Sequence, residues 1–251
     1  MTKPFRWRNC HADVGSSGHG RMAQAFLRDV VEHALATLDS QIERWKKSDE
    51  PAAPFILGDV EDLLRTTTLA FCLSIQSLWE RQIRSYLQGC ARDLKLDPAI
   101  GKRILIARWE EFDGLFKSLR GIGLSAFKEY AELNTLQLLG NACRHGDGPS
   151  LKVLVKMHPE LWPNQGKPLF PPLPEEFGPT PSFPPTIEEM IIPRNLLRAL
   201  VNAIASFWDE TEYIYNESIE RKHPSLEAHL VKVRSERAAR GAPNYRIASE
   251  S

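Results

Sequence analysis

Apolar side chains recur along this chain at the three- and four-residue spacing of amphipathic helices, and the alternation typical of strands is almost absent. The pattern from residue 59 to 95 contains no proline, and its centre, residues 69–75, is apolar nearly all round and should be buried. This patterning predicts an all-α fold, a bundle of long antiparallel helices. The expected helices span residues 21–47, 59–95, 98–120, 124–145, 150–157, 193–219 and 226–240.

Capping residues set several of the expected helix ends. Gly146 follows a helical run and is suited to a left-handed C-terminal cap. Thr186 and Glu189 have the spacing of a capping box, but Ile192 precedes a proline and is biased toward extended backbone. The long helix that follows is therefore expected to begin near Pro193.

Proline and glycine divide the chain into five segments. Ten of the eighteen prolines lie between Pro159 and Pro185, which predicts an extended or polyproline-like arm inserted outside the packed helices. Clustered glycines predict a flexible start. The expected organisation is a flexible N-terminal lead (1–20), a helical bundle carrying the candidate site (21–157), a Pro-rich arm (158–192), C-terminal helices completing the bundle (193–240) and a disordered tail (241–251).

Charge and cysteine content narrow the classes of function. Lys plus Arg and Asp plus Glu both number 32, so no global field draws the chain to nucleic acid or membrane, and polyanion binding requires a local patch. Four scattered cysteines suit reduced thiols. The chain starts without an apolar signal region, and its apolar runs fall short of the ~18 residues of a membrane span. We expect a cytoplasmic protein with no membrane association and no cofactor.

The most informative polar cluster lies where the helix expected at 124–145 ends. On a helix, Asn134, Asn141 and His145 share one narrow stripe, and Arg144 and Asp147 flank its end. An amide supplies donors and an acceptor, an imidazole exchanges protons near neutral pH, and a guanidinium binds phosphate. This set of groups suits a phosphodiester, with the imidazole acting on the proton and the amide and guanidinium holding the oxygens.

The same cluster also has a purely structural explanation. Arg144 and His145 are cations in the last turn of a helix, where each stabilises the helix dipole by about 0.3–1 kcal/mol without any function. Asn141 suits a hydrogen bond to a neighbouring helix, and the Gly-Asp-Gly-Pro sequence that follows is ordinary turn chemistry.

The stretch Asn141–Ser150, with the Pro-rich arm and Ile204–Trp208 that follow it, resembles a group of bacterial helical proteins with an Asn-Ala-x-Lys/Arg-His-Gly-x-Gly signature. More distantly it is similar to HEPN domains, all-α proteins of bacterial defence and toxin systems. Many of these domains are metal-independent ribonucleases that work as dimers. The resemblance implies a HEPN-like fold, a homodimer, RNA as the ligand and a cognate protein partner.

The family motif is an arginine, often followed by asparagine, and then a histidine a few residues later. On this alignment Asn141 matches the asparagine and His145 the histidine, whereas Gly140 stands where the arginine belongs. The resemblance implies that His145 and Asn141 are catalytic and that no metal is needed. The position of the other residues on or beside the same stripe adds Arg144 to the expected catalytic residues and Asn134 and Asp147 as expected substrate-binding residues. Strand cleavage then depends on whether Arg144 replaces the family arginine.

Two further hypotheses remain open. The absence of the family arginine favours a catalytically inactive helical protein that binds a protein partner through its Pro-rich arm. The other hypothesis is a small-molecule pocket around Ser74, Ser77 and Trp79. Cys10, His11 and His19 are a weaker metal candidate, because a fourth ligand at diagnostic spacing is missing.

Overall fold

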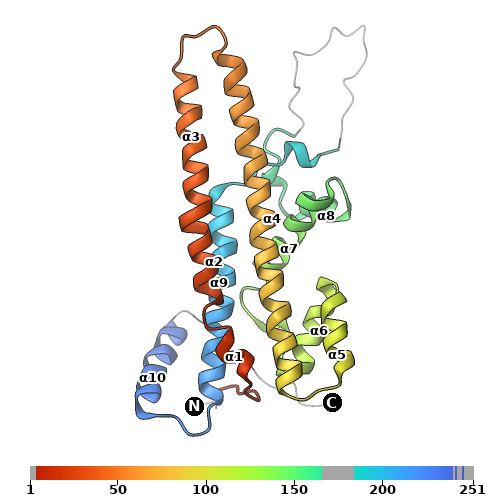
Figure 1. Cartoon of the computed structure of the whole chain (residues 1–251), viewed down its shortest axis with the longest axis vertical. Helices are drawn as coiled ribbons and strands as arrows, with labels where there is room; N and C mark the ends of the chain where they lie inside the picture. Colours follow the sequence, from red (N-terminus) through yellow and green to blue (C-terminus); the bar gives the residue numbers. More distant parts are fainter. Residues whose placement is uncertain (1–3, 166–183, 240, 242–244, 246–251) are drawn as a thin grey trace. The chain divides into compact units, whose positions relative to one another are not determined.

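The structure, a computed structural model, describes residues 4–165, 184–239, 241 and 245. Every regular element in these residues is helical, which confirms the all-α class (Figure 1). None of the described helices has the length and apolar character needed to span a membrane. The α-helices are α1 (His11–Gly15), α2 (His19–Phe26), α3 (Glu32–Lys46), α4 (Ala53–Asp93), α5 (Pro98–Ile106), α6 (Trp109–Arg120), α7 (Tyr130–His145), α8 (Pro149–Met157), α9 (Arg194–Ser218) and α10 (Pro224–Ala239).

The chain divides into two compact units, each assembled from separate stretches of sequence. The first unit comprises Met1–Val30, Ser77–Asn134 and Ala199–Ser251, and the second comprises Val31–Gln76 and Thr135–Arg198. The borders fall inside helices, so α4, α7 and α9 each contribute residues to both units. The two compact units therefore do not correspond to the five segments that proline and glycine define in the sequence.

Aromatic side chains fill the core of the first unit. The ring centroids of Trp79 on α4 and Phe207 on α9 lie 5.0 Å apart, and Phe116 on α6 lies 6.0 Å from Phe207. All three side chains are fully buried. Edge-to-face ring pairs of this kind stabilise a core beyond the burial of their area, so they hold α4, α6 and α9 together.

The N-terminal segment differs from the flexible lead expected at residues 1–20. Within residues 4–20 the structure contains α1 and the start of α2. Trp7 and Asp13 are buried in the first unit, and the backbone N–H of Trp7 donates to Ser218 Oγ at 2.9 Å. A Cβ at Gly20 would lie 3.1 Å from the Cα of Ala205, so this glycine permits close helix packing where composition indicated flexibility.

The helix expected at 98–120 is two helices, α5 and α6, because a side chain of α4 caps the first of them. The Arg84 guanidinium donates to the carbonyl oxygens of Ile104 at 2.6 Å and Ala107 at 2.9 Å. These bonds satisfy carbonyls that a helix end leaves unpaired. The backbone N–H of Arg108 then donates to Glu111 Oε2 at 3.0 Å, which starts α6.

Helix α10 is attached to α9 through ion pairs. The guanidinium of Arg234 donates to both carboxylate oxygens of Glu217, at 2.5 and 2.9 Å, and Arg237 pairs with Glu210. Burial and the neighbouring Glu217 carboxylate raise the pKa of Tyr213 to about 12. Bidentate arginine–carboxylate geometry fixes orientation as well as distance, so it positions α10 on α9 within the first unit.

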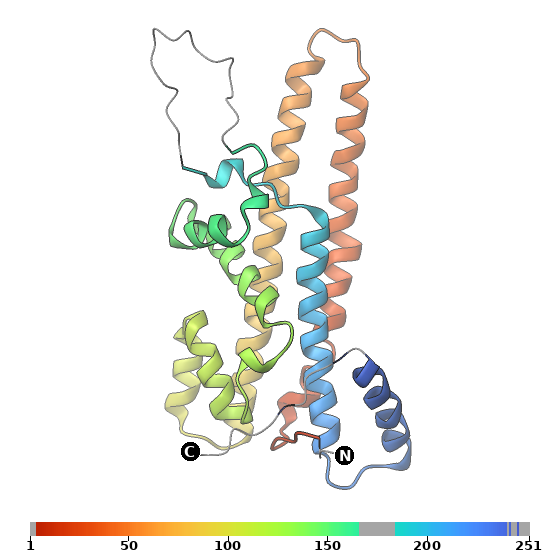
Figure 2. The same ribbon diagram turned by 180° about the vertical axis from the view of Figure 1, so that it is seen from behind.

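The second unit contains an antiparallel pair formed by α3 and the first part of α4 (Figures 1 and 2). Arg194, at the start of α9, pairs with Asp39 at 2.5 Å and donates to the carbonyl of Leu35 at 2.9 Å. The expectation that residues 69–75 are buried throughout is wrong, because Ala70 and Ser74 are exposed. One face of α4 is solvated there.

The described end portions of the Pro-rich arm are joined to each other by hydrogen bonds within the second unit. Trp162 Nε1 donates to the carbonyl of Thr186 at 2.8 Å, and the N–H of Ile191 donates to the carbonyl of Leu161 at 2.8 Å. Thr186 forms the expected capping box, although only a short 3₁₀ turn, Ile187–Glu189, follows it. The arm expected at 158–192 falls partly outside the described residues, at 166–183, as does most of the tail expected at 241–251.

Candidate functional site

Helix α7 ends at His145, and Gly146 follows it with a φ of 70°. The Gly146 N–H donates to the carbonyl of Ala142 at 2.8 Å, which closes the last turn. Residues with a Cβ rarely adopt this left-handed backbone conformation. The backbone geometry at position 146 therefore accounts for the glycine. The predicted cap is confirmed. Helix α8 then begins at Pro149, one residue before the start that the sequence predicted.

A series of amide hydrogen bonds joins α4 to the last turns of α7. Gln76 Nε2 donates to Gln137 Oε1 at 3.0 Å, and Gln137 Nε2 donates to Asn141 Oδ1 at 3.4 Å. Arg144 Nη2 donates to Gln76 Oε1 at 3.3 Å. Gln76 is completely buried, so these bonds satisfy an amide that would otherwise be costly to bury. Gln76 therefore brings Asn141 and Arg144 into one network.

Sequence reasoning missed Gln76, although a signal for it exists. It lies within a helical run whose buried positions include Cys72, Ile75 and Trp79. A polar side chain at that register needs a hydrogen-bond partner from another helix. The register of one helix does not reveal which helix faces it, so the partner could not be named from sequence.

Gly140, one residue before Asn141, lies directly against Gln76. A Cβ built at Gly140 would lie 2.3 Å from Gln76 Cγ and 2.7 Å from Gln76 Cβ. These atoms belong to the inner part of a buried, hydrogen-bonded side chain, which has little freedom to move away. The contact leaves no room for any larger residue at this position, arginine included.

His145 is exposed at the last position of α7. Within the described part of the chain, its imidazole forms no hydrogen bond to another side chain. The exposed imidazole is accessible to a ligand.

Arg144 differs from the other arginines of the second unit. Arg65, Arg194 and Arg198 pair with carboxylates, and Arg44 lies over the Trp45 ring. Arg144 is exposed, and among the described residues its guanidinium contacts neither a carboxylate nor an aromatic ring. Its bond to the neutral amide of Gln76 orients the group without neutralising it. The end of α7 therefore presents uncompensated positive charge.

The two residues assigned to substrate binding each have a structural partner. Asn134 Oδ1 accepts a hydrogen bond from Trp109 Nε1 at 3.0 Å within the first unit. Asp147 Oδ1 accepts from the backbone N–H of Ile187 at 2.7 Å within the second unit. Each bond accounts for the polar side chain without a ligand, so the geometry gives no support to a substrate-binding role for either residue.

A Thr–His–Glu series of hydrogen bonds lies beyond the end of α8 and was not singled out from sequence. Thr135 Oγ1 is 3.1 Å from His158 Nε2, and His158 Nδ1 is 2.9 Å from Glu160 Oε1. The pKa of Glu160 is lowered by a hydrogen bond from its own backbone N–H and by His158. Thr135, His158 and Glu160 follow one another in the order of the nucleophile, base and orienting acid of a catalytic triad. Because Thr135 is buried, however, the arrangement is better explained as a bond that holds the end of α8 to α7.

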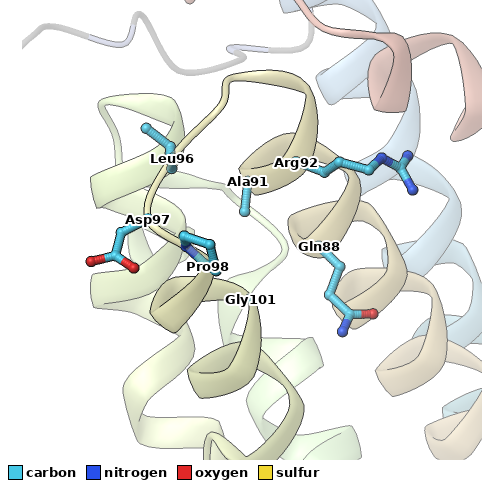
Figure 3. A pocket seen from close by; sticks show the side chains of 7 residues that line it. All are labelled: Gln88, Ala91, Arg92, Leu96, Asp97, Pro98 and Gly101. Atoms are coloured by element: carbon cyan, nitrogen blue, oxygen red, sulfur yellow. The ribbon is translucent and has the colours of Figure 1, made fainter.

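A surface pocket of about 550 Å³ lies in the first unit, between the end of α4 and the start of α5 (Figure 3). Its lining includes Arg92 and Asp97 and none of the candidate residues. Trp79, one of the residues of the small-molecule hypothesis, is fully buried in the aromatic core. Among the described residues, no three His, Cys, Asp or Glu side chains are grouped so that they could hold a metal ion.

Comparison with models of known protein families, with curated proteins and with solved structures found no match.

Proposed function

We propose that this chain is a HEPN-like protein that binds RNA at the end of α7, with Arg144 and His145 contacting phosphate oxygens. The observation that carries the proposal is the exposed Arg144 guanidinium, which no carboxylate of the described residues neutralises. A guanidinium binds phosphate with two N–H groups at once. The resemblance of Asn141–Ser150 to HEPN domains favours RNA over other polyanions and a homodimer as the binding form.

We propose binding without strand cleavage. In the family, the catalytic arginine precedes the asparagine, and here Gln76 occupies the space that such a side chain would need at position 140. Asn141 Oδ1 accepts a bond from Gln137, and Arg144 is oriented by Gln76. These contacts suit a fixed, charged binding surface. His145 alone would have to supply both acid and base.

Titration of a labelled single-stranded RNA, followed by fluorescence anisotropy over a series of salt concentrations, tests the proposal. Arg144→Ala should weaken binding about equally for all RNA sequences and reduce the slope of log affinity against log salt by about 1. Arg144→Lys should retain the slope because it retains the charge. His145→Ala should weaken binding while the unfolding temperature changes little.

Arg44→Ala and His33→Ala are the matched controls, since both residues belong to the second unit but lie on α3 and not on α7. Equal losses of RNA affinity in the control variants and in the Arg144 and His145 variants would refute the assignment of the RNA site to the end of α7. Cleavage in EDTA that leaves 2′,3′-cyclic phosphate ends and disappears in His145→Ala would replace the binding-only proposal with a metal-independent ribonuclease.

A second candidate function, protein binding, is favoured by exposed apolar side chains near the described ends of the Pro-rich arm. Val153, Met157 and Ile191 are 41%, 50% and 45% exposed. Apolar groups at the surface are a feature of protein interfaces. Failure of the wild-type chain to bind RNA at low salt, with its fold intact, would favour this function over the first.

A further inference from the structure

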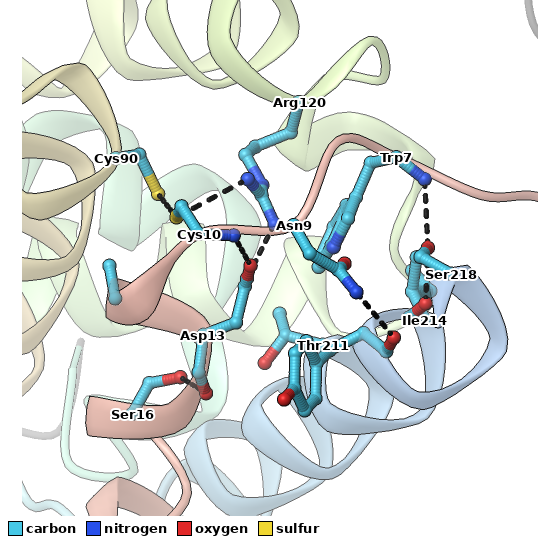
Figure 4. A network of polar contacts seen from close by, with 12 residues as sticks. Trp7, Asn9, Cys10, Asp13, Ser16, Cys90, Arg120, Thr211, Ile214 and Ser218 are labelled. Carbon is cyan, nitrogen blue, oxygen red and sulfur yellow. Dashed lines mark hydrogen bonds and ion pairs between the residues drawn. The ribbon is translucent and has the colours of Figure 1, made fainter. Parts of the chain in front are cut away.

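Two cysteines far apart in the sequence meet in the first unit. Cys10, just before α1, and Cys90, near the end of α4, have their Sγ atoms 3.5 Å apart (Figure 4). Close packing of α1 on α4 makes this contact, because a Cβ at Gly89 would lie 2.8 Å from the Cβ of Ala12. All four cysteines of the chain are free thiols. The two sulfurs are thus nearly in position for a disulfide, whose bond length is about 2.05 Å.

The N-terminal segment around Cys10 is held by buried polar groups, so the contact is fixed. Asp13 forms an ion pair with Arg120, and both side chains are almost completely buried. Asp13 also accepts hydrogen bonds from the Cys10 N–H at 2.8 Å and from Tyr86 Oη at 2.9 Å. Figure 4 shows Cys10, Asp13 and Arg120 converging between α1 and α6. Arg120 Nη1 approaches Cys10 Sγ at 3.8 Å.

The two thiols have different environments. Cys10 is partly exposed, whereas Cys90 is fully buried. The hydrogen bond with the Cys90 thiol lowers the pKa of Cys10; burial and the Asp13 carboxylate oppose this effect, and Arg120 supports it. The same hydrogen bond, together with burial, raises the pKa of Cys90. Cys10 is therefore the better nucleophile and the accessible one, and Cys90 is protected from solvent.

We propose that Cys10 and Cys90 form a redox pair whose substrate is a hydroperoxide, with Cys10 as the attacked thiol and Cys90 as the resolving thiol. This site lies in the first unit and shares no residue with the proposed RNA site.

The reaction balances in two steps. The Cys10 thiolate attacks one oxygen of the hydroperoxide, the O–O bond breaks, and after uptake of one proton the products are Cys10 sulfenic acid and an alcohol, or water when hydrogen peroxide is the substrate. The Cys90 sulfur then displaces the hydroxyl group of the sulfenic acid, and the Cys90 proton leaves with it as water. The two thiols lose two electrons, and the peroxide gains them. A dithiol reductant reverses the disulfide by exchange.

Peptide mapping of the full chain under non-reducing conditions, after treatment with one equivalent of hydrogen peroxide, tests the proposal. The expected product is a single intramolecular link between Cys10 and Cys90 that dithiothreitol removes. In Cys90→Ser, a dicarbonyl reagent should trap sulfenic acid on Cys10. In Cys10→Ser, peroxide consumption should fall at least about tenfold, since the buried Cys90 thiol is a poor nucleophile.

A second thiol pair in the chain supplies the matched control. The neighbouring Cys143 thiol raises the pKa of Cys72, the Cys72 thiol lowers the pKa of Cys143, and Cys143 is partly exposed like Cys10. The Cys143→Ser variant should keep the link between Cys10 and Cys90 and its rate of formation. The proposal is overturned if wild-type protein forms no such link, or if Cys10 links to another chain or to another cysteine at equal yield. Because the link is mapped in the wild-type protein, this result does not depend on whether any variant folds.

Discussion

Replacing Asp13 by asparagine is expected to lower the free energy of unfolding by about 3–5 kcal/mol. The reason is that the Arg120 guanidinium, whose side chain is 0% exposed, would remain buried without its counter-charge. The same carboxylate accepts hydrogen bonds from Tyr86 and from the Cys10 backbone. An asparagine amide cannot accept all of these bonds and neutralise the cation. Urea denaturation of the two proteins measures the difference.

An exposed ion pair in the same unit serves as the control for this prediction. Arg28 and Asp29 are paired at 2.7 Å with side chains 68% and 58% exposed. Asp29→Asn should leave the free energy of unfolding almost unchanged, because solvent screens the pair. Similar decreases in the free energy of unfolding in Asp13→Asn and Asp29→Asn would contradict the claim that burial makes the pair of Asp13 and Arg120 important for stability.

Gly140→Ala is expected to lower the free energy of unfolding by about 1–3 kcal/mol, although alanine is the better helix former. The added methyl group would lie 2.3 Å from Gln76 Cγ, so Gln76 would have to shift and weaken its bonds to Gln137 and Arg144. Thermal and urea unfolding of the variant measure the cost. Gly140→Arg should destabilise the chain further, and under the proposal of binding without cleavage it should not produce a ribonuclease.

Gly58 in α4 is the control position, because a Cβ there meets nothing within 4 Å. Gly58→Ala should raise the free energy of unfolding by up to about 1 kcal/mol through helix propensity alone. Combining Gly140→Ala with Gln76→Ala should cost less than the sum of the two single changes, since the shortened side chain at position 76 lacks the Cγ that would lie 2.3 Å from the new methyl group and keeps only the Cβ contact at 2.7 Å. Additive effects would contradict the contact between these two residues.

Much of the fold follows from the sequence pattern because helix ends obey local rules. The cap at Gly146 and the capping box at Thr186 are determined by residues within one turn, and the structure has both. The break between α5 and α6 has a different origin, since Arg84 on another helix satisfies the carbonyls at Ile104 and Ala107. A cap supplied from a distant part of the chain leaves no local sequence signal.

The candidate site was predictable only as a set of residue types. The sequence places Asn141, Arg144 and His145 near one helix end, but the roles of the first two depend on Gln76, which α4 supplies. Composition also misassigned the N-terminal segment, because glycines permit close packing as well as flexibility. Likewise, the contact between Cys10 and Cys90 depends on how α1 packs against α4.

The proposal that RNA binds at the end of α7 is tested most directly by the imidazole resonances of the seven histidines in nuclear magnetic resonance spectra. Loss of one resonance in His145→Ala assigns His145, and loss in His33→Ala assigns the control. Adding a short single-stranded RNA should shift the His145 resonance progressively and leave that of His33 in place. An unchanged His145 resonance at saturating RNA would contradict the proposed site.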